Sequence, residues 1–105
     1  MLRVKAGANL SGVRPEMFFA AYVVDQEYEA EGIEYTMITE GTGGEHGYGS
    51  LHFVGLALDF RTFNIPTEEA KSFIRDRVAM RLGAQYDVVL ESTHLHVEFQ
   101  PKVKL

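Results

Sequence analysis

The feature that most constrains the fold of this chain is the alternation of large apolar residues with small or polar ones in two short stretches, residues 56–61 and 94–99. One set of alternate positions carries Leu56, Leu58, Phe60, Leu95, Val97 and Phe99. The intervening positions carry Ala57, Asp59, Arg61, His94, His96 and Glu98. Successive side chains of a strand point to opposite faces of a sheet, so the pattern predicts two strands that each have one buried face. The ionisable residues are therefore expected to point away from the core.

A longer stretch before these strands has the spacing of a helix that packs on a sheet. It covers about residues 16–31 and follows Pro15, which suits the first turn of a helix. Its apolar residues recur at helical spacing, and they are Met17, Ala21, Val24 and Tyr28, with Phe18 and Val23 beside them. We expect Met17, Phe18 and Tyr22 to pack in the core, because apolar stripes at this spacing usually do.

A second helix is expected over residues 67–82, with Thr67 as its N-cap. Further strands are expected over residues 2–5, 33–39 and 86–90. The order of helix, strands, helix and strands predicts an α+β fold with a mainly antiparallel sheet and two principal helices. At 105 residues the chain is expected to form a single domain, residues 1–105.

Charge and composition exclude several classes of function. A net charge of −5 argues against a nucleic-acid partner and offers no polybasic patch for a membrane surface. We expect a soluble chain without membrane insertion, because no apolar run reaches spanning length and the N-terminus lacks the apolar region of a signal peptide. The absence of cysteine excludes disulfides, thiolate metal ligands and a cysteine nucleophile.

The residues that can carry chemistry gather in two segments, 50–59 and 91–96, and all four histidines fall in or next to them. Imidazole nitrogen and carboxylate oxygen are zinc ligands, and a catalytic zinc site uses three protein ligands with a fourth position for water. His52 and Asp59 can reach one ion if Gly55 bends the chain between them. A third ligand must come from another strand, where His94 or His96 can bind while the other stands beside the open position. The alternative is a set of histidines that serve only structural or surface roles.

The chain carries the motif Ser50-x-His52-x-x-Gly55-x-Ala57-x-Asp59 and a late His-x-His pair. This combination resembles the zinc D-Ala-D-Ala carboxypeptidases and phage endolysin peptidases, which share a fold with the hedgehog signalling domain. The resemblance extends over about residues 15–99. It implies a hedgehog/DD-peptidase-like fold, a bound zinc ion, and hydrolysis of an amide bond in the peptide stems of bacterial peptidoglycan at the cell wall.

The same resemblance implies a role for each residue of the two segments. His52, Asp59 and His96 correspond to the zinc ligands, and His94 corresponds to the catalytic group that stabilises the transition state or shuttles a proton. A second version of the family uses Glu-x-x-His, with the glutamate as base and the histidine as ligand, and Glu91 and His94 match it. We favour His96 as the ligand because the segment is closest to the His-x-His members, and Glu91 is then the alternative or additional proton carrier.

Substrate binding involves residues outside these two segments. His46 resembles an active-site histidine of the hedgehog-type domain, and Tyr48 in the glycine-rich loop could line the cleft, although a loop or packing role fits each of them equally well. Many of the carboxypeptidases carry an upstream arginine for the substrate carboxylate, and the loop has none. Arg14 and Arg61 are the possible replacements. Both carboxypeptidase and endopeptidase action therefore stay open, as does the oligomeric state.

Two other functions remain compatible with the sequence. One is a non-catalytic, zinc-stabilised, hedgehog-like module that binds a partner surface. The other is a structural domain without a metal.

Overall fold

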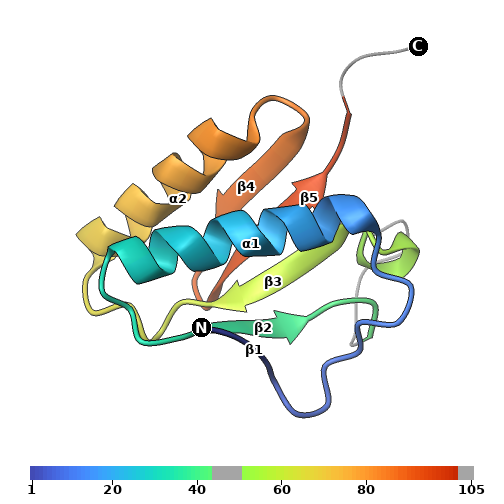
Figure 1. Cartoon of the computed structure of the whole chain (residues 1–105), viewed down its shortest axis with the longest axis horizontal. Helices are drawn as coiled ribbons and strands as arrows, with labels where there is room; N and C mark the ends of the chain where they lie inside the picture. The colour runs from blue at the N-terminus through green and yellow to red at the C-terminus, as the bar shows by residue number, and fades with distance from the viewer. Residues whose placement is uncertain (44–50, 102–105) are drawn as a thin grey trace.

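The computed structural model describes residues 1–43 and 51–101, which form one layer of helices on one sheet (Figure 1). The strands are β1 (Leu2–Val4), β2 (Thr36–Glu40), β3 (Ala57–Arg61), β4 (Tyr86–Leu90) and β5 (His94–Phe99). The helices are α1 (Pro15–Ala30), α2 (Glu68–Leu82) and a short 3-10 helix, η1 (Leu51–Val54). The predicted α+β class, with two principal helices, is confirmed.

The five strands form one sheet in the order β1-β2-β3-β5-β4. β1 pairs in parallel with β2, whereas the β2–β3, β3–β5 and β5–β4 pairs are antiparallel. The parallel pair follows from the chain path, because α1 lies between β1 and β2 and a helical crossover returns the chain in the same direction. The prediction of a mainly antiparallel sheet is therefore confirmed.

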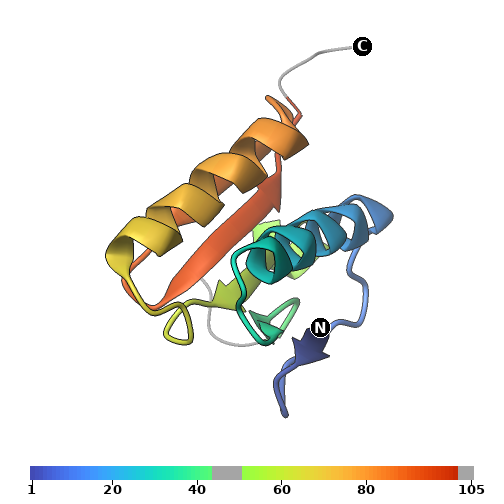
Figure 2. The ribbon, with the colours of Figure 1, turned by 60° about the vertical axis from the view of Figure 1, so that its left-hand side comes forward.

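Both helices pack against the same face of the sheet, as two views of the ribbon show (Figures 1 and 2). The core between them contains side chains from every layer, namely Met17, Val24 and Tyr28 of α1, Ile74 and Val78 of α2, and Ile38, Leu58, Phe60, Val88, Leu95 and Val97 of the sheet. The alternation predicted for residues 56–61 and 94–99 is confirmed for Leu58, Phe60, Leu95 and Val97, which lie in this core, and for Phe99, which packs against it, but Leu56 lies outside the core. The other face of the sheet carries the ionisable residues.

One expectation for α1 is wrong. Met17 is buried as predicted, but Phe18 and Tyr22 are 51% and 57% exposed. The inward face of the helix is already filled by Met17, Ala20, Ala21, Val24 and Tyr28. Phe18 and Tyr22 lie four residues apart on another face, which neither the sheet nor α2 covers. Apolar residues occur on more than one face of this helix, so helical spacing alone did not identify the buried face.

The ends of both helices follow local rules. Pro15 occupies the first turn of α1, and Gly32 follows its end with a φ of +75°. The Thr67 hydroxyl accepts a hydrogen bond from the backbone N–H of Ala70 at 3.0 Å, a cap that contributes about 1 kcal/mol. Within residues 1–43 and 51–101, no helix has the length and apolar character needed to cross a membrane.

Candidate metal centre

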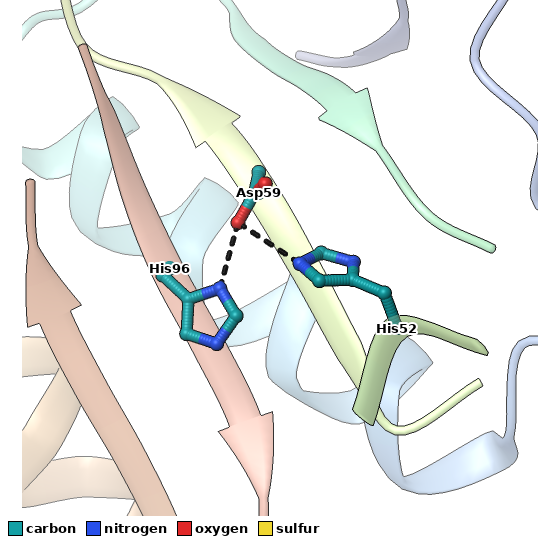
Figure 3. A group of neighbouring side chains, drawn as sticks. All are labelled: His52, Asp59 and His96. Carbon is teal, nitrogen blue, oxygen red and sulfur yellow. Dashed lines mark hydrogen bonds and ion pairs between the residues drawn. The ribbon is translucent and has the colours of Figure 1, made fainter. Parts of the chain in front are cut away.

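Three side chains from three separate elements meet on the open face of the sheet (Figure 3). His52 comes from η1, Asp59 from β3 and His96 from β5. The Oδ1 atom of Asp59 lies 3.4 Å from the Nε2 atom of His52 and 2.8 Å from the Nδ1 atom of His96. One ligand atom from each residue lies within 4.8 Å of the others, so the three can hold a metal ion.

The sheet register brings Asp59 and His96 together. The two residues are directly opposed on β3 and β5, and the alternation of each strand turns both side chains away from the helices. Asp59 is 7% exposed, and burying a carboxylate without partners would cost several kcal/mol. The two imidazoles provide those partners, so His52 and His96 stabilise the buried carboxylate of Asp59 even without a metal.

Residues 9–12, which precede α1, contact the chain both before and after His52, at Thr42 and at Gly55. The backbone N–H of Thr42 donates to the carbonyl of Asn9 at 2.7 Å, which fixes the chain at Gly41. Gly55 has a φ of +78°, and a Cβ atom there would overlap the carbonyl oxygen of Gly12. Gly55 therefore provides the predicted bend and also a close approach of two backbones that only glycine allows.

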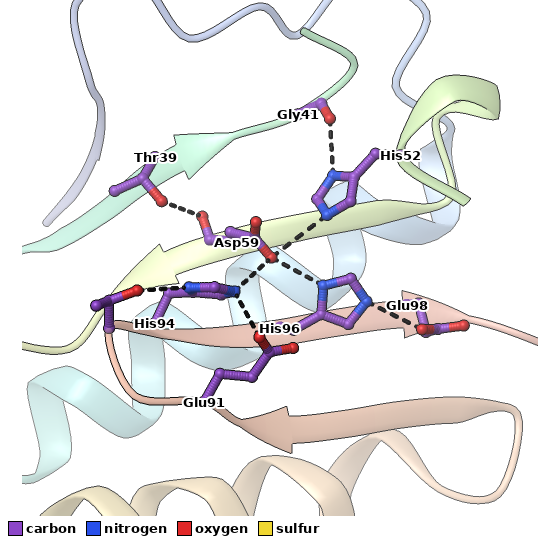
Figure 4. Close-up of polar contacts among 9 residues, drawn as sticks. Thr39, Gly41, His52, Asp59, Glu91, His94, His96 and Glu98 are labelled. Carbon is purple, nitrogen blue, oxygen red and sulfur yellow. Dashed lines mark hydrogen bonds and ion pairs between the residues drawn. The ribbon is translucent and has the colours of Figure 1, made fainter. Parts of the chain in front are cut away.

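The Gly41 carbonyl orients the His52 ring. Its oxygen lies 2.8 Å from the Nδ1 atom of His52, an arrangement in which Nδ1–H donates to the carbonyl and Nε2 faces Asp59 (Figure 4). A metal-binding histidine usually has its second nitrogen held by a carbonyl or a carboxylate, which fixes the tautomer and the ring orientation. His52 has this arrangement, and no sequence pattern predicted the contact with the Gly41 carbonyl.

The ring of His96 is held in the same way but with the opposite nitrogen. Its Nε2 atom lies 2.9 Å from the Oε1 atom of Glu98, while its Nδ1 atom faces Asp59 (Figure 4). Glu98 was not predicted as a site residue. The alternation of β5 places it on the same face as His96, and this was the signal that could have identified it.

The pKa values of the pair reflect their contact. Burial by itself raises the pKa of the Asp59 carboxyl, but the hydrogen bonds and positive charges of the surrounding histidines outweigh it and hold that pKa well below the ordinary 3.8. The hydrogen bond to Asp59 raises the pKa of His96 from 6.5 to about 9, against an opposing effect of burial and with a further contribution from Glu98. Without a metal, the pair is therefore an imidazolium–carboxylate pair at neutral pH.

The donor set suits a metal such as zinc. Two imidazole nitrogens and one carboxylate oxygen converge, and donors around a tetrahedral zinc ion are about 3.3 Å apart. The spacing between the His52 and Asp59 donors is 3.4 Å, and the shorter contact between Asp59 and His96 is that of a hydrogen-bonded pair. Three donors leave a fourth position for water or substrate, as in catalytic rather than structural sites.

Glu91 and His94 lie beside these three residues (Figure 4). They flank the turn between β4 and β5, where the N–H of Glu91 donates to the carbonyl of His94 at 2.8 Å. The Nε2 atom of His94 lies 3.4 Å from Oε2 of Glu91 and 3.6 Å from Oδ1 of Asp59. The sequence required a turn at residues 92–93 for Glu91 to approach the centre, and the structure has that turn.

The other residues predicted to bind substrate are Arg61, Arg14, His46 and Tyr48. Arg61 is the β3 partner of His94, but its guanidinium group contacts the Tyr35 hydroxyl at 3.2 Å and stacks on the Phe63 ring at 4.5 Å. Arg14 lies at the start of α1 and lines a cavity of about 540 Å³ with Phe53, Val54 and other residues. His46 and Tyr48 lie outside the described residues.

No family model matches this chain, and a search of curated proteins finds no significant relative.

Proposed function

We propose that this chain is a zinc-dependent peptidase that hydrolyses an amide bond in the peptide stems of bacterial peptidoglycan. The observation that carries the proposal is the convergence of His52, Asp59 and His96 with both imidazoles already oriented by outer acceptors. A site that only stabilises the fold needs ligands, but it does not need an open position with proton carriers beside it. The proposal includes the hedgehog/DD-peptidase-like fold, for which the order of elements and the place of the site provide the support.

In this proposal His52 Nε2, Asp59 Oδ1 and His96 Nδ1 hold the zinc ion. When bound, zinc acts as a Lewis acid and lowers the pKa of a coordinated water toward about 7. Asp59 contributes one negative charge, and the two histidines bind as neutral imidazoles. The Gly41 carbonyl and the Glu98 carboxylate would each accept a hydrogen bond from the outer ring nitrogen of His52 and of His96, so that the other nitrogen of each ring faces the ion.

Glu91 and His94 handle protons and charge. Either the Oε2 atom of Glu91 or the Nε2 atom of His94 accepts the proton of the attacking water and returns it to the leaving amine. The 3.4 Å separation of these atoms lets the carboxylate stabilise the imidazolium once the histidine is protonated. An imidazolium at this position also stabilises negative charge that develops on the scissile carbonyl oxygen.

The scissile bond follows less directly from these residues. A site on the sheet face opposite the helices is compatible with an extended peptide substrate. Arg61 of β3 lies opposite His94 of β5. We propose that the Arg61 side chain contacts an anionic group of the substrate. Peptide stems of peptidoglycan carry such carboxylates, so both terminal and internal bonds fit this arrangement.

A second candidate function has one observation in its favour. Phe18, Phe19 and Tyr22 form an exposed aromatic cluster on α1, which a module that binds a partner surface would use. In that case zinc would stabilise the fold and no bond would be hydrolysed. The wild-type protein distinguishes the two, because only the peptidase converts its substrate.

The proposed function is tested by digesting purified muropeptides with the zinc-loaded chain and analysing the products by mass spectrometry. The expected result is a pair of products whose summed mass exceeds that of the substrate by one water, and the identity of the pair gives the scissile bond. Asp59→Ala should lose both the bound zinc and the conversion. Wild-type conversion by Asp59→Ala would show that the ligand assignment is wrong.

A further inference from the structure

We propose that Glu91 and His94 form a second, weaker divalent-metal site that shares Asp59 with the first. The inhibitory effect described below rests on the proposed function, whereas the binding itself does not. A metal ion at the second site would be bound by Glu91 Oε2 and His94 Nε2. These are the atoms to which the proposed function assigns proton transfer, so the second ion acts as an inhibitor.

The distances within the second set match those expected of metal ligands. Glu91 Oε2 and His94 Nε2 are 3.4 Å apart, close to the spacing of about 3.3 Å between two donors on one tetrahedral zinc ion. The Oδ1 atom of Asp59 lies 3.6 Å from His94 Nε2, so its carboxylate is within reach of both sites. Glu91 and His94 also form a three-residue ligand set with His96.

A shared carboxylate is the chemical basis for placing two ions here. In two-metal sites the ions lie about 3.5–4 Å apart, so one carboxylate would lie near both. Asp59 already lies between the two sets, since its Oδ1 atom is 3.4 Å from His52 Nε2 on one side and 3.6 Å from His94 Nε2 on the other. His96 belongs to both ligand sets, and in this proposal its Nδ1 atom, which faces Asp59, stays with the first ion.

The second set is preorganised by a turn of two residues. The hydrogen bond from Glu91 N–H to the His94 carbonyl closes the turn between β4 and β5. The Thr93 hydroxyl lies 3.0 Å from His94 Nδ1, which leaves the Nε2 atom directed toward Glu91 and Asp59 (Figure 4). The outer nitrogen of His94 is thus held, as in His52 and His96, although by a hydroxyl rather than a carbonyl or carboxylate.

The second site is weaker because its ligands are more exposed to solvent. The side chains of Glu91 and His94 are 47% and 26% exposed, whereas that of Asp59 is 9% exposed. Water competes better for exposed donors. The first ion should therefore bind at lower metal concentration, and activity should rise with the first equivalent and fall with the second.

The experiment is a titration of the metal-free full chain with Zn²⁺ at neutral pH. It is followed by calorimetry, with native mass spectrometry to count bound ions. The wild type should bind two equivalents with separate affinities. Glu91→Gln and His94→Gln should each keep the first equivalent and weaken the second by roughly tenfold or more, the scale of losing a metal-site partner. Glu68→Gln, which removes an exposed carboxylate of α2, is the matched control and should bind as the wild type does.

Each outcome decides a different claim. A single equivalent in the wild type, or a second equivalent unchanged in Glu91→Gln and His94→Gln, overturns the second site and leaves the proposed function intact. A second equivalent that Glu68→Gln also weakens overturns it too, because the binding is then a general effect of surface carboxylates. No bound zinc in the wild type overturns both the second site and the proposed zinc centre.

Discussion

Asp59 and His96 are directly opposed on β3 and β5, and the Oδ1 atom of Asp59 lies 2.8 Å from the Nδ1 atom of His96. The pairing of two neighbouring strands therefore fixes two of the three proposed ligands with respect to each other. The third, His52, is brought to the same oxygen by η1 and by the backbone of residues 9–12. In the absence of metal, a proton between Asp59 and His96 occupies the place where the ion would bind.

Metal binding should release a proton at neutral pH. The pKa of His96 is raised from 6.5 to about 9 in the metal-free protein, so His96 carries a proton at pH 7 that a metal must displace. We expect about one proton to be released per ion at pH 7, and the apparent affinity to rise with pH until the pH reaches about 9. Asp59 contributes no proton there, because its pKa is lowered.

Calorimetry in buffers with different ionisation enthalpies measures this release. His96→Gln is the matched variant, since it removes the titrating ring and should remove most of the buffer dependence as well as most of the affinity. An observed binding enthalpy that is the same in all buffers for the wild type would contradict the proposed ion pair between His96 and Asp59.

Glu98 should strengthen metal binding without being a ligand. Its carboxylate holds the Nε2 atom of His96 at 2.9 Å, and loss of such an outer partner typically lowers metal affinity by about 10–100-fold. We expect Glu98→Ala to show a loss of this size in competition with a chromophoric chelator. Glu98→Gln keeps an acceptor oxygen and should lose less. Equal affinities in the wild type and both variants would mean that Glu98 has no influence on His96.

Gly55 should be required for stability as well as for the site. Its φ of +78° is unfavourable for other residues by about 1–2 kcal/mol, and a Cβ atom would also overlap the Gly12 carbonyl. Gly32 has a similar φ of +75° with nothing near its Cβ position, so Gly32→Ala is the control. We expect Gly55→Ala to lower the free energy of unfolding more than Gly32→Ala does, as measured by urea denaturation.

A further consequence concerns metal affinity. Gly55→Ala should weaken metal binding because His52 lies in the turn that precedes it, whereas Gly32→Ala should not. Similar losses of stability in the two variants would show that the contact with Gly12 contributes nothing.

Local patterns were sufficient to predict most elements of this fold. Pro15 and Thr67 identified where the two helices begin, and alternation identified which faces of β3 and β5 are buried. The β2 strand was expected from residue 33 but begins at Thr36, because residues 31–35 connect it to the end of α1. The exposure of Phe18 and Tyr22 was not predictable from spacing, since it depends on which face of α1 meets the sheet.

The convergence of His52, Asp59 and His96 was predictable from the sequence, and the groups that orient their side chains were not. His52, Asp59 and His96 are close together because of a sheet register and a short helix that the motif only implied. The Gly41 carbonyl that holds His52 carries no sequence signal, because any residue has a carbonyl and only the tertiary structure selects one. Glu98 did carry a signal, through its place on the same strand face as His96.

The most direct test of the central claim compares the wild type with His94→Gln, with zinc content and muropeptide hydrolysis measured on the same preparations. His94 lies next to the three proposed ligands of the first ion, so both proteins should contain one tightly bound zinc ion per chain. Only the wild type should convert purified muropeptides into two products, and His94→Gln should lose about 10²–10⁴-fold in rate, the usual contribution of a general acid–base group. A wild-type chain that holds zinc and leaves the muropeptides intact, or a His94→Gln chain that cleaves them at the wild-type rate, would contradict the account.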